Sequence, residues 1–102
     1  KNGYKLTVKD ADPTTAMTSA YTTETIPAQA GNLVAGTAGW NLSGGDLTKA
    51  AIATTDQVVK TNPNTDHTGI QEDIQMTYGV ATGTAQAQGT YMDTIVYTAT
   101  TL

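Results

Sequence analysis

The clearest pattern along the chain is an alternation of apolar and polar side chains with a period of two. Residues 3–10 alternate fully, and the apolar side of this segment is formed by Tyr4, Leu6 and Val8. Alternation of this kind is typical of a β-strand that has one face in the core and one face in solvent. The segment ends at Asp10-Ala11-Asp12-Pro13, whose residue types favour a turn. The pattern therefore predicts a strand over 3–10.

Two longer alternating stretches lie in the second half of the chain. In 70–80 one face carries Ile70, Ile74, Met76, Tyr78 and Val80. In 89–99 both faces carry apolar groups, with Tyr91, Ile95 and Tyr97 on one and Met92 and Val96 on the other. We therefore expect a strand in each stretch, and we expect the second strand to be central or covered on both sides.

Shorter strands are predicted at 21–26, 40–43 and 57–60, because each is rich in β-forming residues and is bounded by turn formers. Residues 14–20 are predicted to form a loop, and 27–39 a long connection with at most one short strand. Asp46 has a residue type that caps helices, so 46–53 is the one place where a helical turn is expected.

These elements predict one domain over residues 1–102 with an all-β fold. The expected architecture is an antiparallel immunoglobulin-like β-sandwich of six to seven strands with at most one short helical turn. The side chains expected to pack in its core or against a neighbouring subunit are Tyr4, Leu6, Val8, Trp40, Ile74, Met76, Tyr78, Tyr91, Ile95 and Tyr97.

Composition adds a thin core to this prediction. The chain has 22 Thr but only 16 Leu, Ile and Val together, and 14% of its residues are charged. Thr favours strands, so the excess indicates a polar but strand-forming surface. A small core suggests that neighbouring subunits contribute stability. The net charge of −4 with five Lys disfavours nucleic acid as a partner, and the lack of any long apolar run disfavours membrane insertion.

Few residues suggest chemistry. The chain has no Cys and one His, and it carries no nucleophile elbow and no phosphate-binding loop, so we expect no enzyme, no catalytic residue and no cofactor. Calcium candidates are Asn62, Asn64 and Asp66, which offer oxygen atoms at alternate positions. They lack a bidentate Glu at the proper distance, and a polar hairpin loop is the alternative interpretation. Asp10 and Asp12 are interpreted as turn formers.

Three further carboxylates, Glu72, Asp73 and Asp93, are the candidates for acid–base chemistry. Glu72 falls on the apolar face of its predicted strand, where a buried carboxylate needs a partner. Lys5 or Lys9 would supply one. In surface domains of Gram-positive bacteria such a Lys, facing an Asn beside the buried acid, can form an isopeptide crosslink, but the sequence offers no clear Lys-acid-Asn trio. The alternative is a carboxylate near solvent at a strand end. Among the other polar residues, His67 is expected to be solvated.

The segment 88–99, Gln-Gly-Thr-Tyr-Met-Asp-Thr-Ile-Val-Tyr-Thr-Ala, resembles the last strand of many secreted bacterial β-sandwich modules, including fimbrial and spore-coat-type subunits. Its Gly-x-Tyr start is similar to the tyrosine corner of immunoglobulin-like domains, in which the Tyr hydroxyl binds nearby backbone. Ala87 stands where many such domains have Asp. Segments 2–10, 35–40 and 76–81 resemble the same group of modules, and the matched pieces together cover about a third of the chain.

This resemblance implies an extracellular, cell-surface location and a structural or adhesive role in a bacterial assembly such as a pilus or filament. Modules of this group usually have a further strand before the segment that matches 2–10. We therefore expect a neighbouring subunit to complete the sheet by β-augmentation, the alternative being a sandwich that closes by itself. A second hypothesis is a binding module for carbohydrate or a host protein, using Trp40 or the 62–69 loop. Trp40 is otherwise expected to anchor the core.

Overall fold

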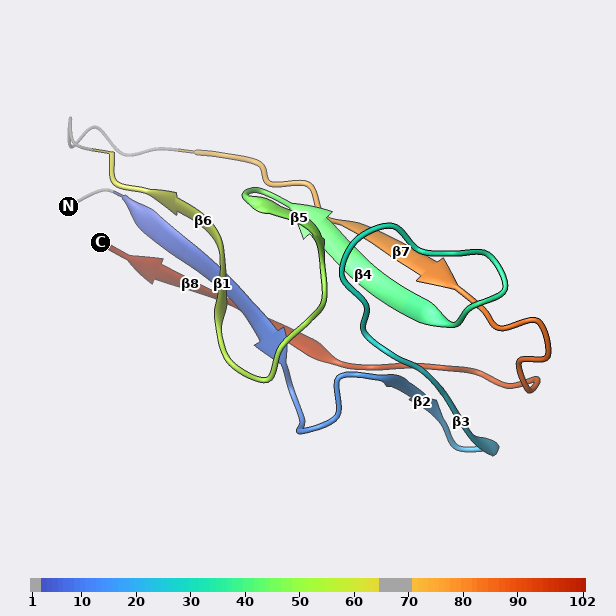
Figure 1. Cartoon of the computed structure of the whole chain (residues 1–102). Coiled ribbons are helices and arrows are strands. Elements are labelled where there is room, and N and C mark those ends of the chain that lie inside the picture. Colours follow the sequence, from blue (N-terminus) through green and yellow to red (C-terminus); the bar gives the residue numbers. More distant parts are fainter. Residues whose placement is uncertain (1–2, 65–70) are drawn as a thin grey trace.

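The computed structural model describes residues 3–64 and 71–102, and these residues form β-strands without any helix (Figure 1). The strands are β1 (Tyr4–Asp10), β2 (Met17–Ser19), β3 (Thr22–Ile26), β4 (Gly39–Gly44), β5 (Leu47–Ala50), β6 (Gln57–Asn62), β7 (Thr77–Ala81) and β8 (Ile95–Thr101). All of the strand pairs are antiparallel. The predicted all-β, antiparallel and sandwich-like architecture is confirmed, with eight strands rather than six or seven.

Two three-stranded sheets, with strand orders β6-β1-β8 and β5-β4-β7, form the body of the fold, and β2 and β3 form a separate hairpin. The molecule is elongated, at 54 × 24 × 18 Å. Figure 1 shows both chain ends at the same end of the molecule, because β1 and β8 pair along their whole length. From the two strand orders, the central strands are β1 and β4, and the edge strands are β6 and β8 in the first sheet and β5 and β7 in the second.

The core lies between the central strands and is small. Within residues 3–64 and 71–102 it consists of six buried apolar residues, namely Val8, Ile26, Trp40, Leu42, Ile52 and Val59. Trp40 is 2% exposed, and its indole N–H donates to the carbonyl of Thr15 at 3.0 Å. This contact ties the loop after β1 to the centre of the second sheet, so Trp40 anchors the core. A binding platform for sugar at Trp40 is excluded, because the ring has no exposed face.

No helical turn forms over 46–53, the segment where at most one was predicted, because this segment contains β5. Gly45 and Asp46 form a two-residue hairpin loop between β4 and β5, and Gly45 has a φ of +56°. Short hairpin loops favour positive φ, and glycine adopts it without strain. The N–H of Asp46 donates to the carbonyl of Val59 at 2.7 Å, so the backbone is held by a neighbouring strand.

The last two strands are shorter or shifted relative to the prediction. The strand predicted over 70–80 is present only as β7, and the strand predicted over 89–99 begins later, as β8. Residues 71–76 are not paired in a ladder, but Ile74 and Met76 still pack against the core. Alternation thus marked which side chains face inward, although no neighbouring strand pairs with this backbone among the described residues. The loop predicted at 14–20 also contains the short strand β2.

A tyrosine-corner contact is present just before β8. The hydroxyl group of Tyr91 donates to the carbonyl of Ala87, four residues upstream, at 2.6 Å. Such a contact fixes a loop to the body of a sandwich. The hydroxyl-to-backbone bond expected from the Gly-x-Tyr sequence is therefore formed, although Ala stands at position 87.

Candidate functional site

The ten residues expected to pack in the core or against a neighbour fall into three groups. Val8 and Trp40 are buried in the core. Five others are partly buried against it, namely Leu6, Ile74, Met76, Tyr91 and Ile95. Tyr4 is half-buried, whereas Tyr78 and Tyr97 are exposed. Tyr78 and Tyr97 come from the edge strands β7 and β8. This side of the sandwich therefore exposes side chains that were expected to be buried.

The side chains of β7 that point between the sheets are not covered. Directly paired residues in a ladder place their side chains on the same face of a sheet. Tyr78 pairs with Leu42 and Val80 pairs with Trp40, so all four lie on the core-facing side. Leu42 and Trp40 are 0% and 2% exposed, but Tyr78 and Val80 are 48% and 52% exposed.

The same difference occurs across the first sheet. Tyr97 of β8 pairs with Val8 of β1, and Ala99 pairs with Leu6. Val8 is fully buried, but Tyr97 is 37% exposed, and Ala99 is exposed as well. The edge strands β7 and β8 therefore both present core-facing side chains to solvent. We call this surface, formed by Tyr78, Val80, Tyr97 and Ala99, the open side.

The open side also carries free backbone groups. β7 and β8 are the last strands of their sheets among the described residues. The bonds from Leu102 N to Gly3 O and from Ala11 N to Thr94 O fix the alternation of hydrogen-bonded pairs between β1 and β8. By this alternation the N–H and C=O groups of Tyr97 and Ala99 point away from β1. A further strand could pair with them directly.

One hydrogen bond links the two edge strands across the open side. The hydroxyl groups of Tyr78 and Tyr97 lie 2.5 Å apart. Partial burial and this hydroxyl contact both raise the pKa of Tyr97 above its usual range. Each of the two rings presents an apolar body with a polar tip at the open side.

A groove of about 470 Å³ opens near one end of the first sheet, between β1, β8 and the segment that follows the undescribed residues. It is lined by Tyr4, Leu6, Gln71, Glu72, Ile74 and Ala99. Ala99 belongs to both the groove and the open side. The groove therefore continues the open side along the inner face of β8.

Glu72 is exposed at the rim of this groove, which agrees with the interpretation of a carboxylate near solvent and not with one buried beside Lys5 or Lys9. Its carboxylate accepts hydrogen bonds from the Tyr4 hydroxyl and from the Asn62 side-chain amide. The hydrogen bond from Tyr4, followed by that from Asn62, lowers the pKa of Glu72. The bond to Glu72 in turn raises the pKa of Tyr4 to about 12. This arrangement explains a solvated carboxylate and gives no support to a crosslink.

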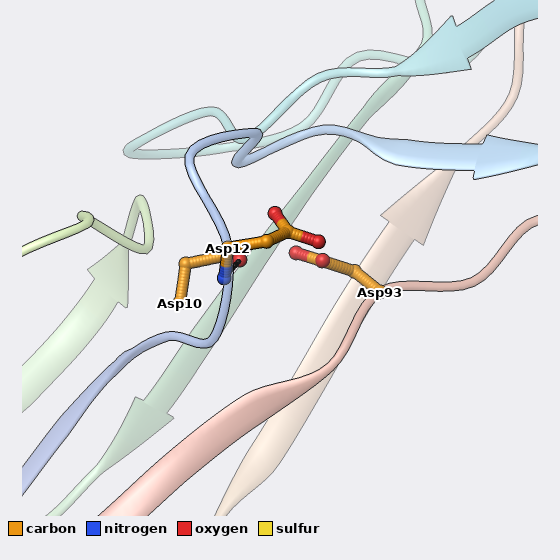
Figure 2. A group of neighbouring side chains, drawn as sticks. All are labelled: Asp10, Asp12 and Asp93. Carbon is orange, nitrogen blue, oxygen red and sulfur yellow. Dashed lines mark hydrogen bonds between the residues drawn. The ribbon is translucent and has the colours of Figure 1, made fainter.

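A second cluster of polar groups lies where β1 ends and the chain approaches β8. Figure 2 shows the carboxyl groups of Asp12 and Asp93 turned toward one another, with Asp10 beside them. Each residue offers a carboxylate oxygen, and these three oxygens all lie within 4.8 Å of one another. Asp10 is buried, Asp93 is half-buried and Asp12 is exposed. The cluster therefore reaches from the interior to the surface.

Backbone N–H groups bind one oxygen of each of these carboxylates. Asp12 N donates to Asp10 Oδ1 at 3.1 Å, and Thr94 N donates to Asp93 Oδ1 at 2.9 Å. Thr14 N donates to Asp12 Oδ1, also at 2.9 Å. The Oδ2 atoms of Asp10 and Asp93 are buried and have no hydrogen-bond partner.

The cluster carries unfavourable like-charge contacts. Burial, the contact with Asp10, and the charges of Asp10 and Asp12 together raise the pKa of Asp93 to about 7, with burial as the largest cause. Sequence reasoning treated Asp10 and Asp12 as turn formers and Asp93 as a separate carboxylate. The available signal was topological, because antiparallel pairing of 3–10 with the last strand brings the end of one beside the start of the other.

The calcium candidates of the sequence lie elsewhere. Asn64 N donates to Asn62 Oδ1 at 3.2 Å, and Asn64 has a positive φ of 43°, which fits a polar turn. Asp66 and His67 lie outside the described residues, as does most of the 62–69 loop. Asp73 is exposed and is not part of the acidic cluster.

No protein-family model, curated protein or solved structure matched this chain. In the part of the chain that the structure describes, no helix is long and apolar enough to cross a membrane.

Proposed function

We propose that this protein is a structural subunit of a bacterial extracellular surface assembly, such as a pilus or filament, and that a β-strand of a neighbouring copy completes its sandwich. The observation that carries this proposal is the open side. Core-facing side chains of both edge strands are exposed there, beside backbone groups that have no strand partner among the described residues.

An added strand would supply both a partner for the unpaired backbone groups and a cover for the exposed side chains. Its backbone would pair with the free N–H and C=O groups of β8, and its alternate side chains would cover Tyr97 and Ala99. The groove beside Ala99 has room for a side chain of such a strand. Long exposed strand edges are otherwise a liability, which proteins limit by covering or charging them. β8 itself carries no charged residue, so its free edge lacks this protection.

The extracellular location is supported by composition and by resemblance. The chain has no Cys and few charges, and its last strand resembles those of secreted bacterial surface modules. A core of six buried apolar residues is small for a chain of this length, which fits a subunit stabilised by its neighbours. The proposed chemistry is thus backbone pairing and side-chain burial, without a catalytic step.

Sedimentation velocity over a wide concentration range, together with electron microscopy of native material, tests this proposal. We expect concentration-dependent oligomers or filaments in the unaltered protein. Val80→Lys places a charge on the open side and should abolish them. Val34→Lys is the control, because Val34 is also an exposed valine, at 57%, but it belongs to the connection between β3 and β4 rather than to an edge strand. A monomer at all concentrations, or equal effects of the two variants, would contradict the proposal.

A second variant distinguishes strand pairing at the edge of the sheet from non-specific hydrophobic association. Proline is tolerated in an edge strand where its N–H would face solvent. Ala99→Pro should therefore preserve the pairing of β8 with β1 but block a strand that pairs on the other edge. In the monomer we expect the amides of Tyr97 and Ala99 to exchange hydrogen quickly, and in the assembly slowly. Slow exchange at both amides in a monomer would indicate a strand from the same molecule and would overturn the proposal.

A further inference from the structure

The acidic cluster holds two buried acceptor atoms that the fold does not satisfy. Asp10 is 3% exposed, and its Oδ2 atom has no hydrogen-bond partner although its carboxylate is part of the cluster. The Oδ2 atom of Asp93 is in the same state. A buried carboxylate oxygen without a partner is costly, and proteins usually pair such a group or use it to bind a metal ion.

We propose that Asp10, Asp12 and Asp93 bind a calcium ion that joins the turn after β1 to the segment leading into β8. Three carboxylate oxygens within 4.8 Å of one another can surround a single cation. The backbone bonds to the Oδ1 atoms hold each carboxylate in place and leave its other oxygen for the ion. The proposal does not depend on the assembly described above.

Ligand type and site shape favour calcium over other metals. Carboxylate oxygens suit hard cations such as Ca²⁺, Mg²⁺ and Mn²⁺, whereas zinc and copper favour nitrogen and sulfur ligands. Calcium accepts irregular sets of six to eight oxygens, including water and carbonyl groups, while Mg²⁺ requires near-ideal octahedral geometry. Three carboxylates from a turn and a separate segment form an irregular set, and exposed Asp12 leaves room for water.

The site is accessible from solvent. A groove of about 420 Å³ is lined by Lys9, Asp10, Ala11, Asp12, Pro13 and Thr54, so an ion can reach the cluster along the turn. Binding would place a positive ion among three carboxylate oxygens that lie within 4.8 Å of one another. It would also reinforce the backbone bond from Ala11 N to Thr94 O, which already joins the same two segments at 2.9 Å.

Thermal unfolding of the chelator-treated protein, with and without calcium, tests the proposal. Isothermal titration calorimetry first gives the Kd for CaCl₂. At free calcium about 100 times this Kd, the unfolding equilibrium constant should fall about 100-fold, and the Tm should rise by about 10 °C. No change in Tm with calcium up to about 10 mM, the weak end of protein calcium sites, would overturn the proposal. An equal response to MgCl₂ would overturn the assignment to calcium.

Variants identify the ligands. Asp93→Asn should lose the response to calcium but keep the stability of the unaltered protein in chelator, because the amide keeps the shape of the side chain and can still accept the bond from Thr94 N. A purely structural Asp93 would instead make this variant less stable under both conditions. If Asp93→Asn does not fold, Asp12→Asn gives the same test at an exposed carboxylate. Asp56→Asn, at an exposed acid outside the cluster, should keep the full response. Loss of the response in Asp66→Asn alone would place the ion in the 62–69 loop and overturn the proposal.

Discussion

The edge strands β7 and β8 carry apolar side chains on the same face as their central partners β4 and β1, yet the central strands bury these side chains whereas β7 and β8 leave them partly exposed. Leu42 and Tyr78 are direct partners in one ladder, and they are 0% and 48% exposed. Val8 and Tyr97 are direct partners in the other, and they are 0% and 37% exposed. Alternation therefore determines which face a side chain joins, whereas the elements packed against that strand determine whether the side chain is covered.

The strongest test of this comparison is truncation of both members of one pair. Leu42→Ala should lower the free energy of unfolding by about 3 kcal/mol, because it leaves a cavity in a small core. Tyr78→Ala should cost the monomer only about 1 kcal/mol, since half of its ring already meets solvent. Urea denaturation at low protein concentration measures both values. Equal losses would show that the open side is as well packed as the core.

A smaller loss of stability is expected at the tyrosine-corner contact before β8, where a hydrogen bond rather than burial holds the chain. Tyr91→Phe removes the hydroxyl that binds the Ala87 carbonyl and should cost about 1 kcal/mol. Tyr21→Phe is the control, because Tyr21 is 81% exposed and should tolerate the change. Urea midpoints of the two variants provide the measurement. A neutral Tyr91→Phe variant would mean that the corner contact contributes nothing to stability.

The smallest effect on the fold is expected at the rim of the groove beside Ala99. There the hydrogen bond between Tyr4 and Glu72 changes the pKa of Tyr4. The carboxylate of Glu72 keeps Tyr4 protonated, and it raises the pKa of this hydroxyl to about 12. At about pH 11, Tyr4 should therefore be largely neutral in the unaltered protein. In Glu72→Gln the pKa should move back toward its ordinary value near 10, so most of Tyr4 should be ionised at the same pH. NMR of ring-labelled tyrosine, assigned with Tyr4→Phe, measures this; identical titrations would contradict it.

Much of the fold follows from local sequence, and the exceptions have identifiable causes. Residues 3–10 alternate without interruption and form β1 as expected. The stretch 70–80 alternates equally well, yet only its end pairs in a ladder, because pairing requires a neighbouring strand that alternation cannot supply. At Asp46 the residue type suggested a helix cap, but the preceding Gly44-Gly45 favours the hairpin turn that the chain forms.

The candidate sites depended more strongly on tertiary structure. The sequence shows both Asp10 and Asp93, but they are 83 positions apart along the chain. They become neighbours only through the pairing of β1 with β8. The open side was harder to predict, because Tyr78 and Tyr97 have the same pattern as core residues. Their exposure follows from strand order, which a single sequence does not contain.

The adjacent chain ends have a mechanical consequence. Tyr4 lies opposite Thr101 at the start of the ladder between β1 and β8. A pulling force applied through these two ends would peel the strands apart, breaking one hydrogen bond after another at low force. A strand inserted lengthwise along the free edge of β8 would instead be loaded in shear, with all of its bonds resisting together. An assembly of such subunits should therefore transmit tension more safely through inserted strands than through the two ends of each domain.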